Sequence, residues 1–116
     1  MSHRDYPGPI NPAAKEALEF LVTPDNPHLY QDLIRSYLKI SDELAESLQK
    51  SHVPDTYRKI AHTWRSSSLS LGAEDLAALC KDLESNPENS DLIPLILIEY
   101  AKVKTALIDS GNLSTV

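Results

Sequence analysis

Cysteine, glycine and positive charge are all scarce in this chain of 116 residues. Its one cysteine, Cys80, cannot form an internal disulfide or a cysteine-rich zinc site, which favours a reducing compartment. Only three glycines, with few β-branched residues outside residues 92–103, leave little material for hairpins and predict an all-α fold. Eleven lysines and arginines against 17 aspartates and glutamates give a net charge of −6, which argues against nucleic acid as a partner.

Long hydrophobic runs are missing as well. The most apolar stretch, residues 92–98, is too short to span a bilayer and contains Pro94, and the N-terminus has no apolar segment of signal-peptide type. We therefore expect no membrane association and a cytoplasmic location. The length suits a single domain, and we expect a flexible lead-in over residues 1–10, a helical bundle over residues 11–110 and a tail over residues 111–116.

Prolines preceded or followed by Asn or Asp divide the chain into five expected helices. Asn11-Pro12, Asp25-Asn26-Pro27 and Pro54-Asp55 are each typical of a helix start with its cap. The expected helices run from Pro12 to before Pro24, from Pro27 to about Lys50, from about Thr56 to Gly72, from Ala73 to before Ser85, and from near Asp91 to Gly111. Short connections between the last four predict an antiparallel up-and-down four-helix bundle, with the short first helix over one end.

Apolar residues recur at helical spacing in every one of these segments, so each predicted helix has an inward face. The expected inward residues are Ala14, Ala17, Leu18 and Leu21 in the first helix; Tyr30, Leu33, Ile34, Tyr37, Leu44 and Leu48 in the second; Tyr57, Ile60, Ala61, Trp64, Ser68 and Leu71 in the third; Ala73, Leu76, Ala77, Cys80 and Leu83 in the fourth; and Ile93, Ile96, Leu97, Tyr100, Val103 and Leu107 in the fifth.

One histidine lies away from the inward face of the third predicted helix. At about 100° per residue, His62 falls about 140° from Tyr57, the centre of that face, and we expect it in solvent. An exposed imidazole among cations suits the binding of a phosphoryl group, because guanidinium donors match phosphate oxygens. An ordinary surface histidine has the same pattern and is more common. The neighbours within one or two turns are Arg58, Lys59, Arg65, Ser66 and Leu69.

The stretch over residues 61–84 reads AHTWRSSSLSLGAEDLAALCKDLE. It resembles the signature of the histidine-containing phosphotransfer (HPt) domain, in which Ala-His-x-Leu-Lys-Gly-Ser-Ser is followed by Gly-Ala and by a Leu-Cys or Leu-Ala step that ends in Leu-Glu. Residues 92–108 resemble the last helix of that family. His, a basic residue three positions later, the serine pair and Gly-Ala stand at the family's spacing, which makes the resemblance specific.

The resemblance implies a role for each matching residue. His62 is then the phosphoryl acceptor, Arg65 takes the place of the lysine that steadies the phosphoryl group, and Ser66 takes the place of a glycine. Arg65 keeps the charge but presents a larger planar fork, and the hydroxymethyl group of Ser66 either donates to phosphate or hinders the partner. Trp64 replaces a leucine on the core face. Arg58, Lys59 and Leu69 would contact the docked receiver domain.

The resemblance also implies a phosphorelay. His62 would accept a phosphoryl group from a receiver-domain aspartate on Nε2 and pass it to another receiver aspartate, so the partners are receiver domains of response regulators and hybrid sensor kinases. They would dock on the outer face of the third helix and the neighbouring face of the second. Mg²⁺ is expected on the receiver, and on this chain we expect no metal, no cofactor and no independent kinase or phosphatase activity. We expect a monomer.

Three alternatives compete with the relay. The first is a helical adaptor of the same fold with weak or lost phosphotransfer, motivated by Ser66. The second, a hydrolase that uses Ser67 or Ser68, lacks a Gly-x-Ser-x-Gly elbow, and Ser68 lies on the core face. The third is a metal site built from His3, His28, His52 and His62, whose spacing fits no metal motif. Cys80 is expected to be a small buried apolar residue.

Overall fold

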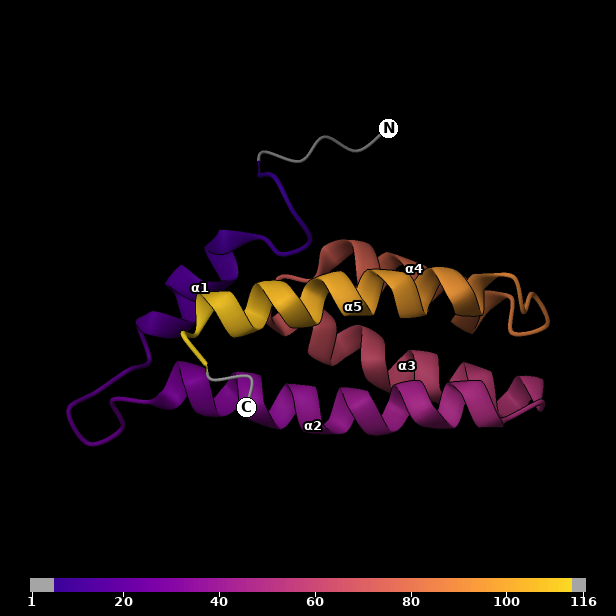
Figure 1. Cartoon of the computed structure of the whole chain (residues 1–116), viewed down its shortest axis with the longest axis horizontal. Coiled ribbons are helices and arrows are strands. Elements are labelled where there is room, and N and C mark those ends of the chain that lie inside the picture. Colours follow the sequence, from indigo (N-terminus) through magenta and orange to yellow (C-terminus); the bar gives the residue numbers. More distant parts are fainter. Residues whose placement is uncertain (1–5, 114–116) are drawn as a thin grey trace.

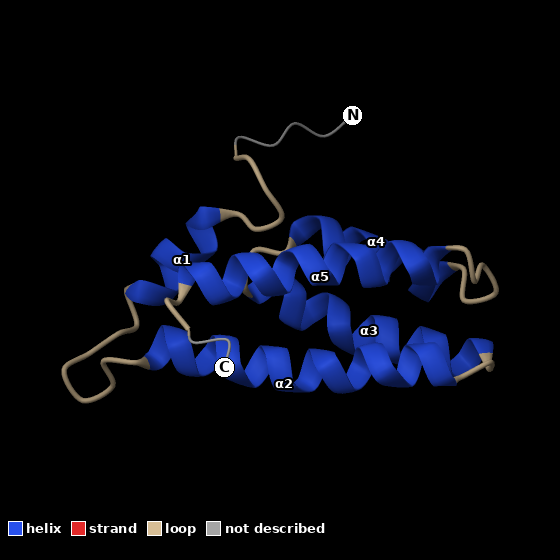
Figure 2. Ribbon diagram, viewed as in Figure 1, coloured by secondary structure: helices blue, strands red, loops and turns tan. Residues whose placement is uncertain are grey.

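The computed structural model describes residues 6–113, which form five α-helices and, within that range, no strand (Figure 1, Figure 2). The helices are α1 (Pro12–Glu19), α2 (Leu29–Lys50), α3 (Pro54–Ser70), α4 (Glu74–Ser85) and α5 (Leu92–Ser110). The prediction of an all-α fold is thus confirmed for the described residues. His3, the first half of the predicted lead-in and the end of the predicted tail lie outside them.

Helices α2, α3, α4 and α5 form a ring around one core. Each contacts the next, and α5 returns to α2, while α1 contacts α2 at one end of the ring (Figure 1). The strictly antiparallel order of the four long helices stays a prediction. In the range 6–113, no helix is both long and apolar enough to cross a membrane.

The predicted inward faces of the last four helices are confirmed. Every expected residue of α3 and α4 is buried, as are Tyr30, Ile34, Tyr37 and Leu48 of α2 and Ile96, Tyr100, Val103 and Leu107 of α5. Three other expected residues of α2 and α5 pack partly buried against this core: Leu44, Ile93 and Leu97. Leu33 is half-buried. Helical periodicity was sufficient here because each of these helices has neighbours along most of its length.

The predicted inward face of the first helix is wrong for Ala17 and Leu21, which are exposed, whereas Ala14 and Leu18 are half-buried. α1 ends at Glu19, buries none of its residues, and leaves Leu21 60% exposed beyond its end. The chain departs from the helix in successive turns, in which the N–H of Leu21 donates to the carbonyl of Leu18 (3.0 Å) and that of Val22 to Glu19 (3.1 Å). A helix of about two turns has room for few inward residues. Leu18 packs against the core, and Lys15 Nζ donates to the carbonyl of Ser110 at the end of α5 (3.1 Å).

Of the three predicted helix N-caps, the one at Asn11 is confirmed and the other two are wrong. Asn11 caps α1 as predicted, because its Oδ1 accepts from the N–H of Ala13 at 3.0 Å. The start of α2 was misplaced, since the helix begins at Leu29 with His28 in the cap position and no side-chain cap. Pro54 is the first residue of α3, and Asp55 lies in its first turn instead of capping it.

Gly72 makes the turn between α3 and α4 and receives the N-terminal segment. Its φ of +82° is one that residues with a Cβ rarely adopt, and a Cβ there would lie 2.6 Å from the carbonyl oxygen of Asn11. The N–H of Asn11 donates to the carbonyl of Gly72 at 2.8 Å. Tyr6 and Asn11 both donate from their side chains to the carboxylate of Glu74, at 2.9 and 3.1 Å. The Gly-Ala step of the motif therefore holds α1 against the α3–α4 turn.

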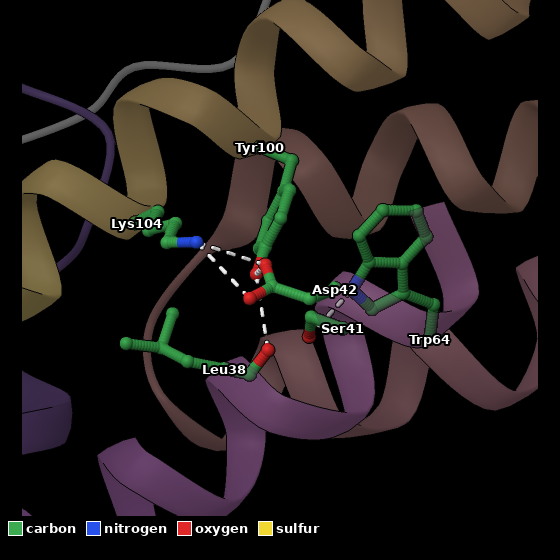
Figure 3. A network of polar contacts seen from close by, with 6 residues as sticks. All are labelled: Leu38, Ser41, Asp42, Trp64, Tyr100 and Lys104. Atoms are coloured by element: carbon green, nitrogen blue, oxygen red, sulfur yellow. Dashed lines mark hydrogen bonds and ion pairs between the residues drawn. The ribbon is translucent and has the colours of Figure 1, made fainter. Parts of the chain in front are cut away.

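A polar network that extends from the core to the surface fixes α3 against α2 and α5 (Figure 3). The fully buried Trp64 donates from its indole Nε1 to Ser41 Oγ at 3.0 Å, and its ring meets that of Tyr100 edge-on at 5.1 Å. The Tyr100 hydroxyl donates to Asp42 at 2.6 Å, and Lys104 Nζ lies 3.0 Å from both oxygens of the same carboxylate. Because the indole N–H is satisfied only in one orientation of Trp64, the rotation of α3 about its axis is fixed.

Candidate functional site: the exposed histidine of α3

His62 projects from α3 on the side opposite the core. Its side chain is 66% exposed, whereas its neighbours Ala61 and Trp64 are buried. The prediction that this histidine faces solvent is confirmed. Since Trp64 is two residues further along the same helix and held by Ser41, the network that orients Trp64 also orients the imidazole.

A carboxylate from α4 holds one nitrogen of this ring. Nδ1 of His62 lies 2.6 Å from Oε2 of Glu84, whose side chain is only 22% exposed. A carboxylate can only accept a hydrogen bond, so Nδ1 carries the proton and donates it to Glu84. Nε2 is then left with its lone pair directed away from Glu84. The arrangement selects Nε2 as the nucleophilic atom of an exposed imidazole.

Arg65 completes this group from the same helix. Its Nη1 lies 3.1 Å from the other oxygen of Glu84, Oε1, and its side chain is one-third exposed. Glu84 therefore bridges an imidazole and a guanidinium that are one turn apart on α3. The fork of Arg65 and the ring of His62 are thus held by the same carboxylate.

Sequence reasoning assigned no role to Glu84. It recognised the residue only as the end of the Leu-Glu step of the motif. A signal was nevertheless present, because Glu84 follows Ala77 and Cys80 at spacings of seven and four residues, both of which are inward residues of α4. An acidic residue at the margin of an inward face is placed to reach the neighbouring helix.

The other two cations predicted around His62 are engaged by a carboxylate of their own. Asp55 Oδ1 lies 2.6 Å from Arg58 Nη2, and its Oδ2 lies 3.2 Å from Lys59 Nζ. These contacts, led by the hydrogen bond from Arg58, lower the pKa of the Asp55 carboxyl. Three cations and two carboxylates leave a local charge of +1 (3 − 2). The basic character expected around His62 is thus present but largely balanced.

Ser66 and Leu69 lie on the same exposed side of α3 as His62. Ser66 accepts a hydrogen bond on its carbonyl from the hydroxyl of Ser70 at 3.2 Å, and its own side chain is exposed. Leu69 is 53% exposed and forms one wall of a shallow apolar pocket between α3 and α4. Lys81 of α4, which sequence reasoning did not single out, lines the same pocket beside Arg65.

A larger apolar groove flanks the site on the α2 side. It has a volume of about 490 Å³, and α3 contributes Ser67, Ser70 and Leu71 to its wall. Ser67 directly follows Ser66 in α3, which brings the groove next to the candidate site. The remaining lining residues come from α1, from the segment between α1 and α2, and from α2: Leu18, Leu21, Leu29, Leu33, Ser36, Tyr37 and Ile40.

The serines that a hydrolase would need are already engaged. Ser68 is fully buried and shares a hydrogen bond of 2.8 Å with the hydroxyl of Tyr37, and Ser67 donates to the carbonyl of Trp64 at 3.2 Å. Cys80 is buried as predicted, and this burial raises the pKa of its thiol to about 12. Among residues 6–113, no three histidine, cysteine, aspartate or glutamate side chains gather as a metal site would require.

Comparison with protein-family models matches residues 28–106 to the model of the Hpt domain. The matched span is more than half of the chain and runs from the start of α2 into the last turns of α5, so it contains His62, Arg65 and Glu84. No curated protein and no solved structure matches the chain.

Proposed function

Because the chain belongs to the Hpt domain family and is thus a histidine phosphotransfer module of two-component signalling, we propose that His62 carries the phosphoryl group between receiver domains. The observation that supports this assignment best is the hydrogen bond of 2.6 Å between Nδ1 of His62 and Glu84. In the neutral imidazole, a proton held on Nδ1 by this contact leaves Nε2 with the lone pair on an exposed ring, as a phosphoryl acceptor requires.

In the first step, the lone pair of Nε2 attacks the phosphorus of an aspartyl phosphate on a receiver domain. The N–P bond forms while the bond from phosphorus to the aspartate oxygen breaks, and the carboxylate leaves with the electron pair. The proton on Nδ1 stays between His62 and Glu84, so the positive charge that develops on the ring lies beside a carboxylate. In the second step, an aspartate of another receiver attacks the phosphorus, and the electron pair returns to Nε2.

Arg65 and Ser66 are the residues of this chain placed to contact the phosphoryl oxygens. The guanidinium of Arg65 donates in a fork that matches two oxygens, and its ion pair with Glu84 holds it beside the ring. The hydroxyl of Ser66 is one turn from His62 and exposed. Phosphoryl transfer depends chiefly on positioning and on charge stabilisation, which these two donors supply.

We propose that the receiver docks across the outer side of α3 and the adjoining side of α2. The apolar groove of about 490 Å³ between these helices and the pocket at Leu69 lie on either side of the exposed stripe of α3. Both can accept apolar side chains of a partner. The small local charge of +1 suits a partner bound through apolar contacts at least as much as through charge. Arg58 and Lys59 would lie at the rim of this interface, where ion pairs contribute little.

The partner would supply the rest of the reaction site. We propose that the receiver binds the Mg²⁺ that neutralises the transferring group and that this chain holds no cofactor of its own. The chain then acts as a carrier without independent kinase or phosphatase activity. Its imidazole, Arg65 and Ser66 can hold a phosphoryl group, but the donor and the acceptor of that group belong to the partners.

A labelling experiment tests this function. The chain is incubated with a receiver domain charged with radioactive phosphate, and we expect an acid-labile, alkali-stable label on the chain. His62→Gln should abolish the label, whereas His52→Gln should retain it, because His52 is also exposed but lies before α3. Label that persists in His62→Gln would contradict the assignment.

An adaptor of the same fold is the second candidate. It is favoured by Ser66 in the position of the family's glycine and by the pairing of Arg58 and Lys59 with Asp55. The same experiment separates the two functions. An adaptor would bind receivers in a pull-down or by calorimetry, but the unaltered chain would take up no label.

A further inference from the structure

A second exposed stripe runs along α5. Six residues at alternating spacings of four and three fall on one side of this helix and all are exposed: Asp91, Leu95, Ile98, Lys102, Thr105 and Asp109. Two of the three in its first half are apolar, with Leu95 51% and Ile98 57% exposed. Alternating spacings of four and three are the pattern with which one helix packs along another. We call these six residues the α5 seam.

The seam lies on the far side of the bundle from His62. α5 packs against α4 and α2, while α3 packs against the same two helices from the other side of the ring (Figure 1). The outward sides of α3 and α5 therefore point in different directions. Pro9 borders the later half of the seam, next to Lys102 and Thr105, so its open part extends from Asp91 to Lys102.

This open part is complementary to itself. If two α5 helices pack in antiparallel directions about an axis between residues 96 and 97, Leu95 of each chain meets Ile98 of the other. In the same register, each Asp91 meets a Lys102. A parallel arrangement would instead bring Asp91 to Asp91 and Lys102 to Lys102, which repel each other. Only the antiparallel pairing brings apolar residues into contact with apolar residues and acidic residues into contact with basic ones.

We propose that the α5 seam binds a second copy of this chain in a two-fold symmetric, antiparallel α5–α5 contact. A two-fold axis requires a surface that complements itself, and the order acidic, apolar, apolar, basic meets that requirement. The contact buries few apolar residues, so the dimer is weak and forms with rising concentration. It differs from the monomer that we expected from the sequence.

Sedimentation velocity tests the association. The intact chain, studied from about 5 to 500 µM, should pass from monomer toward dimer, as a small interface predicts. Asp91→Lys and Lys102→Asp should each weaken dimerisation by roughly three- to tenfold, because each puts like charges at two symmetry-related positions. The double variant exchanges the charges and should restore the association. A chain that stays monomeric over the whole range overturns the proposal.

The control for these variants is Leu69→Glu, which changes an equally exposed leucine on the other side of the bundle. It should dimerise like the unaltered chain. If Leu69→Glu abolishes the dimer while the charge exchange on α5 has no effect, the chains associate through the His62 side and the α5 contact is wrong.

Carbodiimide cross-linking tests the register. This reagent joins a carboxylate to an amine only where the two are in contact. Asp91 and Lys102 of one chain are about 16 Å apart along the helix, at 1.5 Å per residue, and cannot be joined within it. In an equal mixture of ¹⁵N-labelled and unlabelled chains, half of the Asp91–Lys102 links should therefore join a labelled chain to an unlabelled one. The link between Glu99 and Lys102 serves as the positive control for cross-linking within one chain, because Glu99 Oε1 lies 3.8 Å from Lys102 Nζ. Dimer without the Asp91–Lys102 link would overturn the antiparallel register.

The proposal is independent of phosphotransfer. Both copies of His62 remain exposed in such a dimer, so Lys102→Asp should take up phosphate from a receiver at the rate of the unaltered chain. A failure of His62 to become labelled would leave the sedimentation and cross-linking results as they are.

Discussion

Nδ1 of His62 and Oε2 of Glu84 lie 2.6 Å apart, although 22 residues separate them in the chain. The contact joins α3 to α4 beside the ion pair of Arg65 with the same carboxylate. It decides which nitrogen of the imidazole carries the proton and which one is available to phosphorus. Under the proposed function, the reactivity of His62 would therefore depend on Glu84, a residue that contacts neither the phosphoryl group nor the solvent side of the ring.

Replacement of Glu84 by alanine should lower the rate of His62 phosphorylation by about tenfold or more, which corresponds to the loss of one hydrogen bond to a charged group. In ¹⁵N NMR spectra, the imidazole should change from the tautomer protonated at Nδ1 toward the one protonated at Nε2. Asp82→Ala is the matched control, because Asp82 is an exposed acidic residue of the same helix, and it should change neither quantity. An unchanged tautomer in Glu84→Ala would show that Glu84 does not position the ring.

Ser66→Gly restores the family's residue and tests whether the hydroxymethyl group obstructs the partner. The free energy of unfolding should stay the same or fall by up to about 1 kcal/mol, since glycine is unfavourable in an exposed helix interior. If Ser66 hinders the incoming receiver, phosphotransfer should become faster in stopped-flow or rapid-quench measurements. A slower rate would indicate that the hydroxyl donates to the phosphoryl group, and an equal rate would exclude both effects.

Leu69→Glu should weaken receiver binding by roughly five- to tenfold, because it puts a charge into the apolar pocket between α3 and α4. Calorimetric titration with a receiver measures the change. Val53→Glu is the control, since Val53 is equally exposed but lies at the other end of α3. The circular dichroism of both variants should equal that of the unaltered chain, and a loss of helicity in Leu69→Glu would mean that the leucine packs in the core.

Stability should fall as the pH rises above neutrality. Burial raises the pKa of the Cys80 thiol to about 12 and also raises the pKa of the Tyr37 and Tyr100 hydroxyls. Unfolding exposes these groups, which then ionise at their ordinary values of about 8.5 and 10. Above pH 8.5 the unfolded chain has thus lost protons that the folded chain keeps, and the free energy of unfolding decreases as the pH rises. The contribution of the thiol to this decrease ends at about pH 12.

Urea denaturation at several pH values between about 7.5 and 10.5 measures this slope, to which the thiol should contribute up to about 1.4 kcal/mol per pH unit. Cys80→Ala removes the contribution of the thiol, so the decline should then begin only near the pKa of the tyrosines. A Cys80→Ala variant with an unchanged slope would show that the thiol is not protected from ionisation.

Periodicity in the sequence was enough to orient each long helix. A helix advances about 100° per residue, so the buried positions from Tyr57 to Leu71 leave His62 no direction other than solvent. The Asn11 cap and the turn at Gly72 were predictable for the same local reason, because each depends on the conformation of one or two residues. The sequence therefore determined the exposure of the histidine and the neighbours that it has on α3.

Features that depend on the distance between helices were not predictable in this way. Asp55 was expected to cap α3 but binds Arg58 and Lys59, and Leu21 was expected to be buried but is 60% exposed. Glu84 can contact His62 only if α4 runs back beside α3 at a particular distance between the two helices. The turn at Gly72 and the packing of Trp64 together set that distance. The sequence periodicity of a helix predicts the direction in which each of its side chains points. Which side chain of a neighbouring helix it contacts depends on how the two helices pack in the core.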